Sequence, residues 1–265
     1  MLSKIRQIIR GNALPQPNVP AGQRVYAIGD IHGRHDLFEE LVGLIEADDA
    51  ARGAGCSSSE TTIVLLGDLI DRGPDSAGVL DAAIALCARR PVRLIAGNHE
   101  EMLLTAFERR EVLRAFITYG GRETMLSYGL DRDAYNEATL DELQAMLPTL
   151  IPERHLAFMR AMENQVRIGD YLFVHAGIRP GVDLELQRLS DLRWIRREFL
   201  EDKRDHGVMV IHGHTIADAV DERANRIGID TGAYASGVLT AVGLEGTARW
   251  YLSTLGDGGL EQPSG

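Results

Sequence analysis

The segment GDLIDRG at residues 67–73 follows directly on the apolar run TTIVLL at residues 61–66, and this junction is the clearest structural signal in the chain. A continuous apolar run of this length is typical of a strand covered on both faces, as in a parallel sheet. The glycine at its end allows a sharp turn, so the next side chain can point into the crevice beyond the strand. The segment therefore predicts a buried strand that carries carboxylates to one edge of a sheet.

Four other segments repeat this combination of an apolar run, a glycine and a polar side chain. They are GDIHG at 29–33, GNHE at 97–100, HAG at 175–177 and GHT at 213–215. In open α/β sheets, binding sites form beyond the carboxyl ends of the strands. We therefore expect all five segments to converge on one site, although they are far apart in the sequence.

The first half of the chain alternates between strand and helix patterns. Apolar runs at 24–28, 61–66 and 92–96 predict strands, and apolar residues at helical spacing predict helices over 37–47 and 76–88. The order β-α-β-α-β favours a parallel sheet with right-handed crossovers. The following residues are expected to form mainly helices that cap the sheet. That helical region spans 100–162, with breaks at Gly120-Gly121, Gly129 and Pro148.

The second half of the chain is predicted to be mainly β. Two short runs that flank Gly169-Asp170 have the pattern of a hairpin, and a helix is expected over 189–200. Further strands are predicted at 208–212, 226–230, 238–244 and 248–252. The predicted fold class is α/β, with two packed mixed sheets (a β-sandwich) flanked by helices. A short arm with an amphipathic helix is expected at 1–21, a single domain at 22–254 and a flexible tail at 255–265.

Composition narrows the classes of function. Lys and Arg number 28 against 39 Asp and Glu, a formal charge of −11, which disfavours a nucleic-acid binder because phosphate neutralisation supplies most of such affinity. The two cysteines are too few for a disulfide framework and favour a reducing, cytoplasmic location. No apolar run approaches the ~18 residues of a membrane span, and the N-terminus lacks the apolar core of a signal peptide.

Six side chains at the predicted strand ends are oxygen or imidazole donors, and none is a thiolate. Such a set suits Mn²⁺, Fe or Zn²⁺. Six ligands are too many for one catalytic ion, but they fit two divalent ions that share a carboxylate. A single Asp at a strand end is usually a turn or helix cap, but six donors in one pattern indicate a metal site. The donors are Asp30, His32, Asp68, Asn98, His175 and His214.

The five segments, in this order, resemble the motifs of the calcineurin-like metallophosphoesterases. More narrowly, they resemble the phosphoprotein phosphatase family with its bacterial and phage, lambda-phosphatase-like members, over about residues 22–252. The resemblance implies a β-sandwich catalytic domain and a serine/threonine protein phosphatase, with dual specificity an open option. It also implies a phosphoprotein or phosphopeptide substrate and two divalent ions, Mn²⁺ being the first expectation and Fe or Zn²⁺ the alternatives.

The resemblance also implies a role for each donor. The first ion would be bound by Asp30, His32 and Asp68, and the second by Asp68, Asn98, His175 and His214, with Asp68 shared. A water activated by both ions would be the nucleophile.

The remaining roles concern the leaving group and the phosphate. His99 would protonate the leaving oxygen, and Asp71 would accept a hydrogen bond from His99 and keep it cationic. Arg72 would bind phosphate oxygens, and Arg196, in the sequence Trp194-Ile195-Arg196, would do the same. In the same resemblance, Asp230 is expected to be structural and Tyr234 to lie at the edge of the cleft.

Two other functions are weighed against this one. A diadenosine tetraphosphatase or broad nucleotide phosphohydrolase shares most of the motifs, but its pattern lacks the acid at Asp71 and has Asp in place of Glu100. Both residues therefore favour the protein phosphatase. A catalytically silent metal-binding scaffold is the non-enzyme alternative, and it is disfavoured because no ligand of the pattern is missing.

Overall fold

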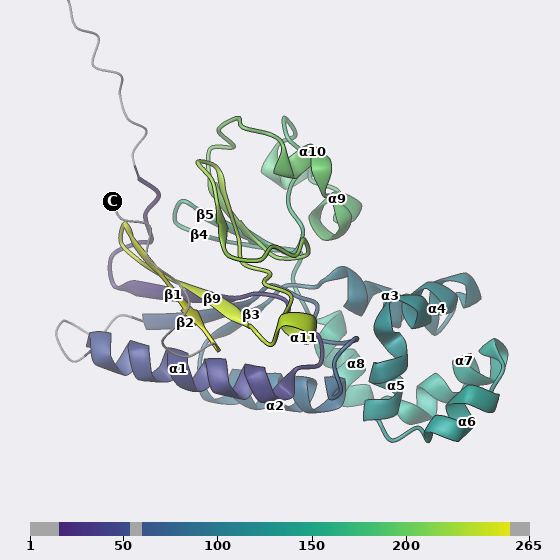
Figure 1. Cartoon of the computed structure of the whole chain (residues 1–265). Helices are drawn as coiled ribbons and strands as arrows, with labels where there is room; N and C mark the ends of the chain where they lie inside the picture. The colour runs from purple at the N-terminus through teal and green to yellow at the C-terminus, as the bar shows by residue number, and fades with distance from the viewer. Residues whose placement is uncertain (1–15, 54–59, 255–265) are drawn as a thin grey trace, which may run out of the picture.

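The computed structural model describes residues 16–53 and 60–254, which form two five-stranded sheets packed face to face (Figure 1). The first sheet has the strand order β10-β9-β1-β2-β3. Strands β1, β2 and β3 run parallel to one another, and β9 and β10 are antiparallel to their neighbours. The strands are β1 (Gln23–Ile28), β2 (Glu60–Leu65), β3 (Val92–Leu94), β9 (Thr240–Glu245) and β10 (Ala248–Ser253).

The second sheet has the order β4-β5-β6-β8-β7, with a parallel centre and an antiparallel strand at each edge. Its strands are β4 (Gln165–Ile168), β5 (Tyr171–Val174), β6 (Met209–His212), β7 (Asp221–Glu222) and β8 (Arg226–Gly228). The predicted hairpin at Gly169-Asp170 joins β4 to β5. The predicted fold class, two packed mixed sheets flanked by helices, is confirmed.

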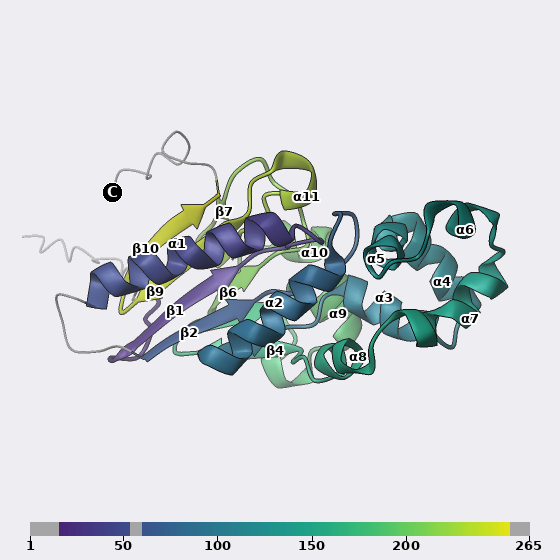
Figure 2. The ribbon, with the colours of Figure 1, turned by 90° about the horizontal axis from the view of Figure 1, so that it is seen from below.

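Apolar layers on both faces of the first sheet explain its continuous apolar strands. On one face, Val25 and Val64 pack against Phe173 and Ile211 of the second sheet, and all four are buried. The other face is covered by α1 (His35–Gly53) and α2 (Ser76–Arg89), which lie across the strands in Figure 2. Strands covered in this way have no polar face, so their sequences do not alternate.

A group of helices follows β3, as predicted, and α4–α7 lie together at one end of the molecule in both views (Figures 1 and 2). Gly120, at φ 116°, interrupts the helical path as expected. The predicted break at Pro148 is wrong: Pro148 lies in the last turn of α7, where it removes only one backbone hydrogen bond. The elements are α3 (Asn98–Ala106), α4 (Arg110–Phe116), a π-helical turn (Ile117–Gly121), α5 (Arg122–Ser127), α6 (Arg132–Glu137), α7 (Leu140–Leu150) and α8 (Glu153–Arg160).

The outer face of the second sheet is covered by two short helices where one was predicted over 189–200. These are α9 (Leu189–Trp194) and α10 (Arg197–Leu200), separated by Ile195 in an extended conformation. The break allows α9 and α10 each to bury an apolar side chain, Leu192 and Phe199, against the sheet. The short elements β7 and α11 (Ala233–Ser236) were not predicted, because two to four residues carry no usable periodicity.

Some predictions fall on residues that the structure does not describe. The amphipathic helix of the N-terminal arm, the C-terminal tail and Cys56 lie in 1–15, 255–265 and 54–59. None of the helices in the described part of the chain has the length and apolarity that a bilayer crossing demands.

Gly67, the glycine that ends β2, is expected to be irreplaceable for stability. Its φ is 91°, and a Cβ placed there would lie 2.5 Å from the backbone nitrogen of Gly97. Gly67→Ala should lower the free energy of unfolding by roughly 2–4 kcal/mol, because both the conformation and the space exclude a methyl group. Urea denaturation of the purified protein measures this.

Gly43 provides the matched control, because it lies in α1 and a methyl group added there would have no atom within 4 Å. Gly43→Ala should leave stability unchanged or raise it by about 0.5–1 kcal/mol, since alanine is the better helix former. Equal effects of the two substitutions would contradict this account of Gly67.

Candidate dinuclear metal centre

The loops that follow β1, β2, β5 and β6 and the start of α3 meet at one end of the two sheets. Backbone hydrogen bonds join them: His32 N–H donates to the Asp68 carbonyl (2.9 Å), and Gly213 N–H donates to the His175 carbonyl (2.8 Å). The five sequence segments that end in glycine and polar residues therefore lie side by side in space.

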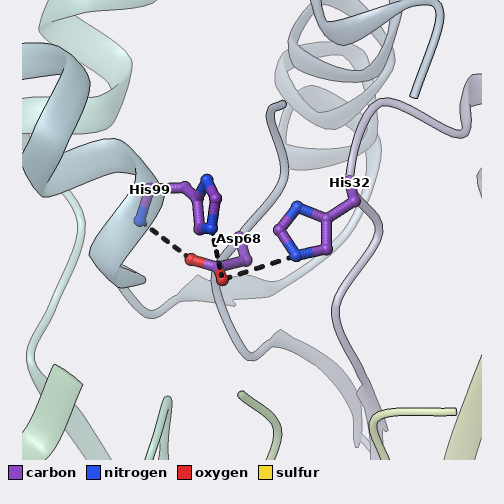
Figure 3. A group of neighbouring side chains, drawn as sticks. All are labelled: His32, Asp68 and His99. Carbon is purple, nitrogen blue, oxygen red and sulfur yellow. Dashed lines mark hydrogen bonds and ion pairs between the residues drawn. The ribbon is translucent and has the colours of Figure 1, made fainter. Parts of the chain in front are cut away.

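The Asp68 carboxylate lies at the centre of this arrangement and is 1% exposed. Its Oδ2 faces the Nε2 atoms of His175 at 3.4 Å, His32 at 3.6 Å and His99 at 3.8 Å. Figure 3 shows the carboxylate of Asp68 between the rings of His32 and His99. Burial alone would raise the pKa of Asp68, but the imidazoles of His175 and His99 outweigh it and hold that pKa well below its usual range.

Two of these imidazoles have the tautomer that metal binding requires. The Nδ1 atoms of His32 and His175 each donate to a backbone carbonyl, that of Ile70 and that of Leu66, both at 2.8 Å. In the neutral His32 ring this leaves the Nε2 lone pair directed toward the Asp68 carboxylate. Burial opposes a charge on His175, but Asp68 outweighs it and raises the pKa of His175 to about 10, so its Nε2 carries a proton toward the same carboxylate. Burial lowers the pKa of His32 to about 3, so this ring is neutral. A lone pair that faces a carboxylate is stabilised by a cation between them, either a proton, as on His175, or a metal ion.

His214 completes a second cluster with Asp68 and His175, whose candidate ligand atoms lie within 4.8 Å of one another. Its Nδ1 lies 3.2 Å from His175 Nε2, which is also 2.9 Å from Asn98 Oδ1. Burial, and then the charge on His175, lowers the pKa of His214 to about 2. Its buried Nε2 has no hydrogen-bond partner. A neutral ring whose Nδ1 faces the other candidate ligands fits a metal ligand.

Asp30 lies beside this cluster, where its carboxylate accepts from His214 N–H at 3.1 Å. Burial, and then repulsion by Asp230, raises the pKa of Asp30 well above its usual range. Asp230, expected to be merely structural, is itself buried, and its carboxylate also accepts from Gly232 N–H at 2.9 Å. Buried carboxylates that repel one another in this way would be stabilised as anions by nearby cations, which is a second reason to expect metal ions there.

His99 is held differently from the other imidazoles. Its Nδ1 lies 2.6 Å from Asp71 Oδ2, and its Nε2 lies 3.1 Å from the Arg72 guanidinium. Burial opposes a charge on His99, but Asp68 and Asp71 outweigh it and raise the pKa of this ring. Although His99 lies close enough to His32 and Asp68 to bind the same ion, both of its nitrogens have partners. This arrangement fits a proton carrier better than a ligand.

The position of Asp71 depends on Thr124, which sequence analysis missed. The Thr124 hydroxyl donates to Asp71 Oδ1 at 2.6 Å and accepts from Asp71 N–H at 3.0 Å. Thr124 lies in α5, within the helical group, so no local sequence signal connects it to Asp71. This pair of bonds ties the helices to the side of the site that holds Asp71 and His99.

Arg72 presents its guanidinium to the site without a carboxylate partner in the described residues. It lies 4.8 Å from the centre of the Tyr234 ring, and its Nε donates to the Tyr119 carbonyl at 3.4 Å. Tyr234 also contacts His32 edge-on, with ring centres 5.5 Å apart, so it does lie at the edge of the site as expected. A positioned but unneutralised guanidinium suits binding of a phosphate anion.

Arg196 lies near His214. Its side chain is exposed, and its charge contributes to the lowered pKa of His214, after burial and His175. Trp194, two residues earlier, contacts the His214 ring with centres 6.4 Å apart. The two arginines predicted to bind phosphate therefore lie near different site residues, Arg72 beside His99 and Arg196 near His214.

Glu100, which the motif comparison used to favour a protein phosphatase, has a structural role. Its buried carboxylate accepts from the backbone N–H groups of Asp68 (2.9 Å), Leu69 (2.7 Å) and Gly97 (2.9 Å). It thus holds the loop after β2 against the start of α3. Glu100 therefore binds backbone inside the protein and offers no direct contact by which to distinguish substrates.

Comparison with known proteins indicates the family to which the chain belongs. The family model of the calcineurin-like phosphoesterases matches residues 23–236. The chain is 35% identical over 162 residues to the symmetrical bis(5'-nucleosyl)-tetraphosphatase of Acidovorax sp. strain JS42, covering 59% of this chain and 44% of that protein. It is 26% identical to the asymmetrical bis(5'-nucleosyl)-tetraphosphatase PrpE of Geobacillus thermodenitrificans, covering 81% of this chain and 88% of that protein. The chain thus spans about half the length of the symmetrical relatives it matches, 44–57% for three of them.

Two solved structures share the fold. One, assigned provisionally as a diadenosine tetraphosphatase, has a TM-score of 0.60 and 20% identity, and covers 91% of this chain and 100% of its own. A cold-active protein tyrosine phosphatase has a TM-score of 0.57 and 18% identity, with 90% and 81% covered. The match over most of the sequence and the strand-end motifs agree: the chain belongs to the calcineurin-like phosphoesterase family.

Proposed function

We propose that this protein is a dinuclear metal-dependent phosphohydrolase that acts on bis(5'-nucleosyl) tetraphosphates. The observation that carries the substrate is the similarity to named tetraphosphatases, one group of which matches along 88% of its length. This reverses the order of the two enzyme functions weighed from the sequence. The case for a protein phosphatase relied partly on Glu100, which binds backbone N–H groups and not the substrate.

The residues proposed to hold two divalent ions are those predicted from the strand ends. Asp30, His32 and Asp68 would bind one ion, and Asp68, Asn98, His175 and His214 the other. The neutral rings of His32 and His214 and the buried carboxylates support this assignment. When bound, two such ions would supply the Lewis acidity that activates water and offsets phosphate charge.

Arg72 would bind the phosphate and at the same time control His99. Its guanidinium NH2 group lies 3.1 Å from His99 Nε2, where it can only donate, so this ring nitrogen carries no proton in the geometry observed. A phosphate anion would compete for the guanidinium and draw it away from the ring. His99 Nε2 would then be free to take up a proton, with Asp71 stabilising the resulting cation.

The contact between His99 and Asp71 favours a second candidate, the hydrolysis of alkyl phosphomonoesters such as phosphoserine. An alkoxide needs a proton to leave, whereas a nucleoside phosphate, with a pKa of about 6, leaves readily as an anion. A buried acid held by Asp71 at 2.6 Å is of more use to the first kind of leaving group.

A direct comparison of substrates tests the proposed function. With Mn²⁺ supplied, kcat/KM for diadenosine tetraphosphate should exceed that for phosphoserine, phosphothreonine and phosphotyrosine peptides by at least about tenfold. Chromatography of the products distinguishes symmetrical cleavage, which yields two diphosphates, from asymmetrical cleavage, which yields a triphosphate and a monophosphate. A phosphopeptide turned over more efficiently than the dinucleotide would establish the second candidate instead.

Asp68→Asn is expected to disrupt both metal sites, because Asp68 is the one carboxylate shared between them. After equilibrium dialysis against Mn²⁺, the unaltered protein should retain about two ions per chain, and the variant should bind Mn²⁺ at least about a hundredfold more weakly. Elemental analysis by mass spectrometry measures the content. Asp133→Asn, on the exposed surface of α6, is the control and should retain both ions. Two tightly bound ions in Asp68→Asn would refute the shared role.

His99→Asn should slow hydrolysis according to the leaving group. Loss of a general acid costs about 10²–10⁴-fold, and the full loss is expected on an alkyl phosphate. On diadenosine tetraphosphate or p-nitrophenyl phosphate the loss should be much smaller, with Mn²⁺ content unchanged. The control, His35→Asn at the start of α1, should leave all rates as they are. If His99→Asn lowered every rate equally, His99 would have no role as the acid.

A further inference from the structure

Exposed apolar side chains gather at the rim of a site whose centre is polar. Seven large apolar residues of the described chain are exposed, and three of them adjoin site residues. The backbone of Tyr119 binds Arg72, Trp194 contacts His214, and Ile216 follows His214 by two residues. Neither phosphate binding nor metal binding requires exposed apolar side chains. These side chains therefore indicate that another part of the substrate contacts the rim of the site.

Trp194 is the best defined of these side chains. It is the last residue of α9, is 40% exposed, and its Nε1 donates to Glu101 Oε2 at 3.1 Å. The hydrogen bond fixes the plane of the indole. The ring is therefore preorganised beside the site and has a large uncovered area.

The surroundings of Trp194 keep a ring face open. In the described residues, Trp250 is covered by the Arg52 guanidinium at 3.5 Å, and Tyr234 is approached by that of Arg72 at 4.8 Å. Arg193, next to Trp194, is instead turned to Glu101 (3.4 Å) and to Asn164 (2.7 Å). No guanidinium of the described chain lies over Trp194, although it is flanked by arginines.

Arg196 is the second residue next to the site that is available to contact a ligand. It follows Trp194 by two residues and is exposed. Its backbone carbonyl accepts from Phe199 and Leu200 N–H, but its guanidinium has no hydrogen-bond or ion-pair partner among the described residues. A flat aromatic surface and an unpaired cation thus lie together on the His214 side of the site. A nucleotide carries two matching groups. Its base offers a flat aromatic face for the indole, and its phosphate, linked to the base through the sugar, offers an anion for the guanidinium.

We infer that Trp194 and Arg196 form a nucleotide subsite, in which the base stacks on the indole while its phosphate contacts the guanidinium. This inference rests on the proposed function for its choice of ligand. Stacking of a base on an aromatic side chain is worth enough to change affinity by about tenfold or more. Trp194 would therefore determine specificity for nucleotides over other phosphates.

Binding of ADP and of pyrophosphate, measured by calorimetry in the presence of Mn²⁺, tests the subsite without reference to turnover. The unaltered protein should bind ADP about tenfold more tightly than pyrophosphate. Trp194→Ala should abolish this advantage while leaving pyrophosphate affinity unchanged, and Trp194→Phe should retain most of it. Leu189→Ala, which removes another exposed apolar side chain from α9, is the matched control and should change neither affinity.

The outcomes separate this inference from the proposed function. A base-dependent advantage that is lost in Trp194→Ala supports the subsite even if diadenosine tetraphosphate is not hydrolysed. Equal affinities for ADP and pyrophosphate in the unaltered protein would overturn it even if the dinucleotide is a good substrate. Equal loss of both ligands in the Ala and Phe variants would also overturn it, because the ring would then serve only to hold Glu101 in place.

Discussion

The carboxylate of Asp68 is buried where the ends of strands from both sheets meet, and its charge orders the groups around it. An isolated carboxylate in such a place would cost several kcal/mol. Here three imidazole nitrogens face Oδ2 at 3.4–3.8 Å, and the backbone N–H of His99 donates to Oδ1 at 3.0 Å. These partners come from the first sheet, the second sheet and α3. The requirement to surround one negative charge therefore sets how the three parts come together.

Satisfying that charge strains the backbone. The described non-glycine residues with positive φ, between 47° and 74°, all belong to the site segments: His32, Asp68, Asp71, Arg72 and His214. Each costs roughly 1–2 kcal/mol in a left-handed conformation. The conformation turns the side chain out of the strand direction and toward the other segments. The two apolar layers on the first sheet hold the loop bases rigid enough for this strain to persist.

Sequence alone predicted all the strands except β7, the parallel order of the first three and the meeting of the five segments, because each of these has a local signal. Apolar runs that end in glycine and a polar residue, as at Gly67-Asp68, carry both the strand and its function. The contact of Thr124 with Asp71 had no such signal, because it joins segments that are distant in sequence. The same holds for Glu100, whose buried carboxylate links two loops. The break at Ile195 was missed for the same reason: burial against the second sheet, and not local propensity, determines it. Which substrate binds depends on side chains such as Trp194 whose exposure only the fold reveals.

The hydrogen bond from His175 to the Leu66 carbonyl and that from His214 to Asp30 both cross from the second sheet to the first. The candidate ligands are divided in the same way, with Asp30 and Asp68 on one layer and His175 and His214 on the other. The site is therefore also a joint between the two halves of the sandwich. A substitution that weakened ligation would loosen that joint as well, so selection for a stable fold and selection for activity act on the same few side chains. Over evolutionary time such a chain is free to change its rim, where the substrate is recognised, far more readily than its centre.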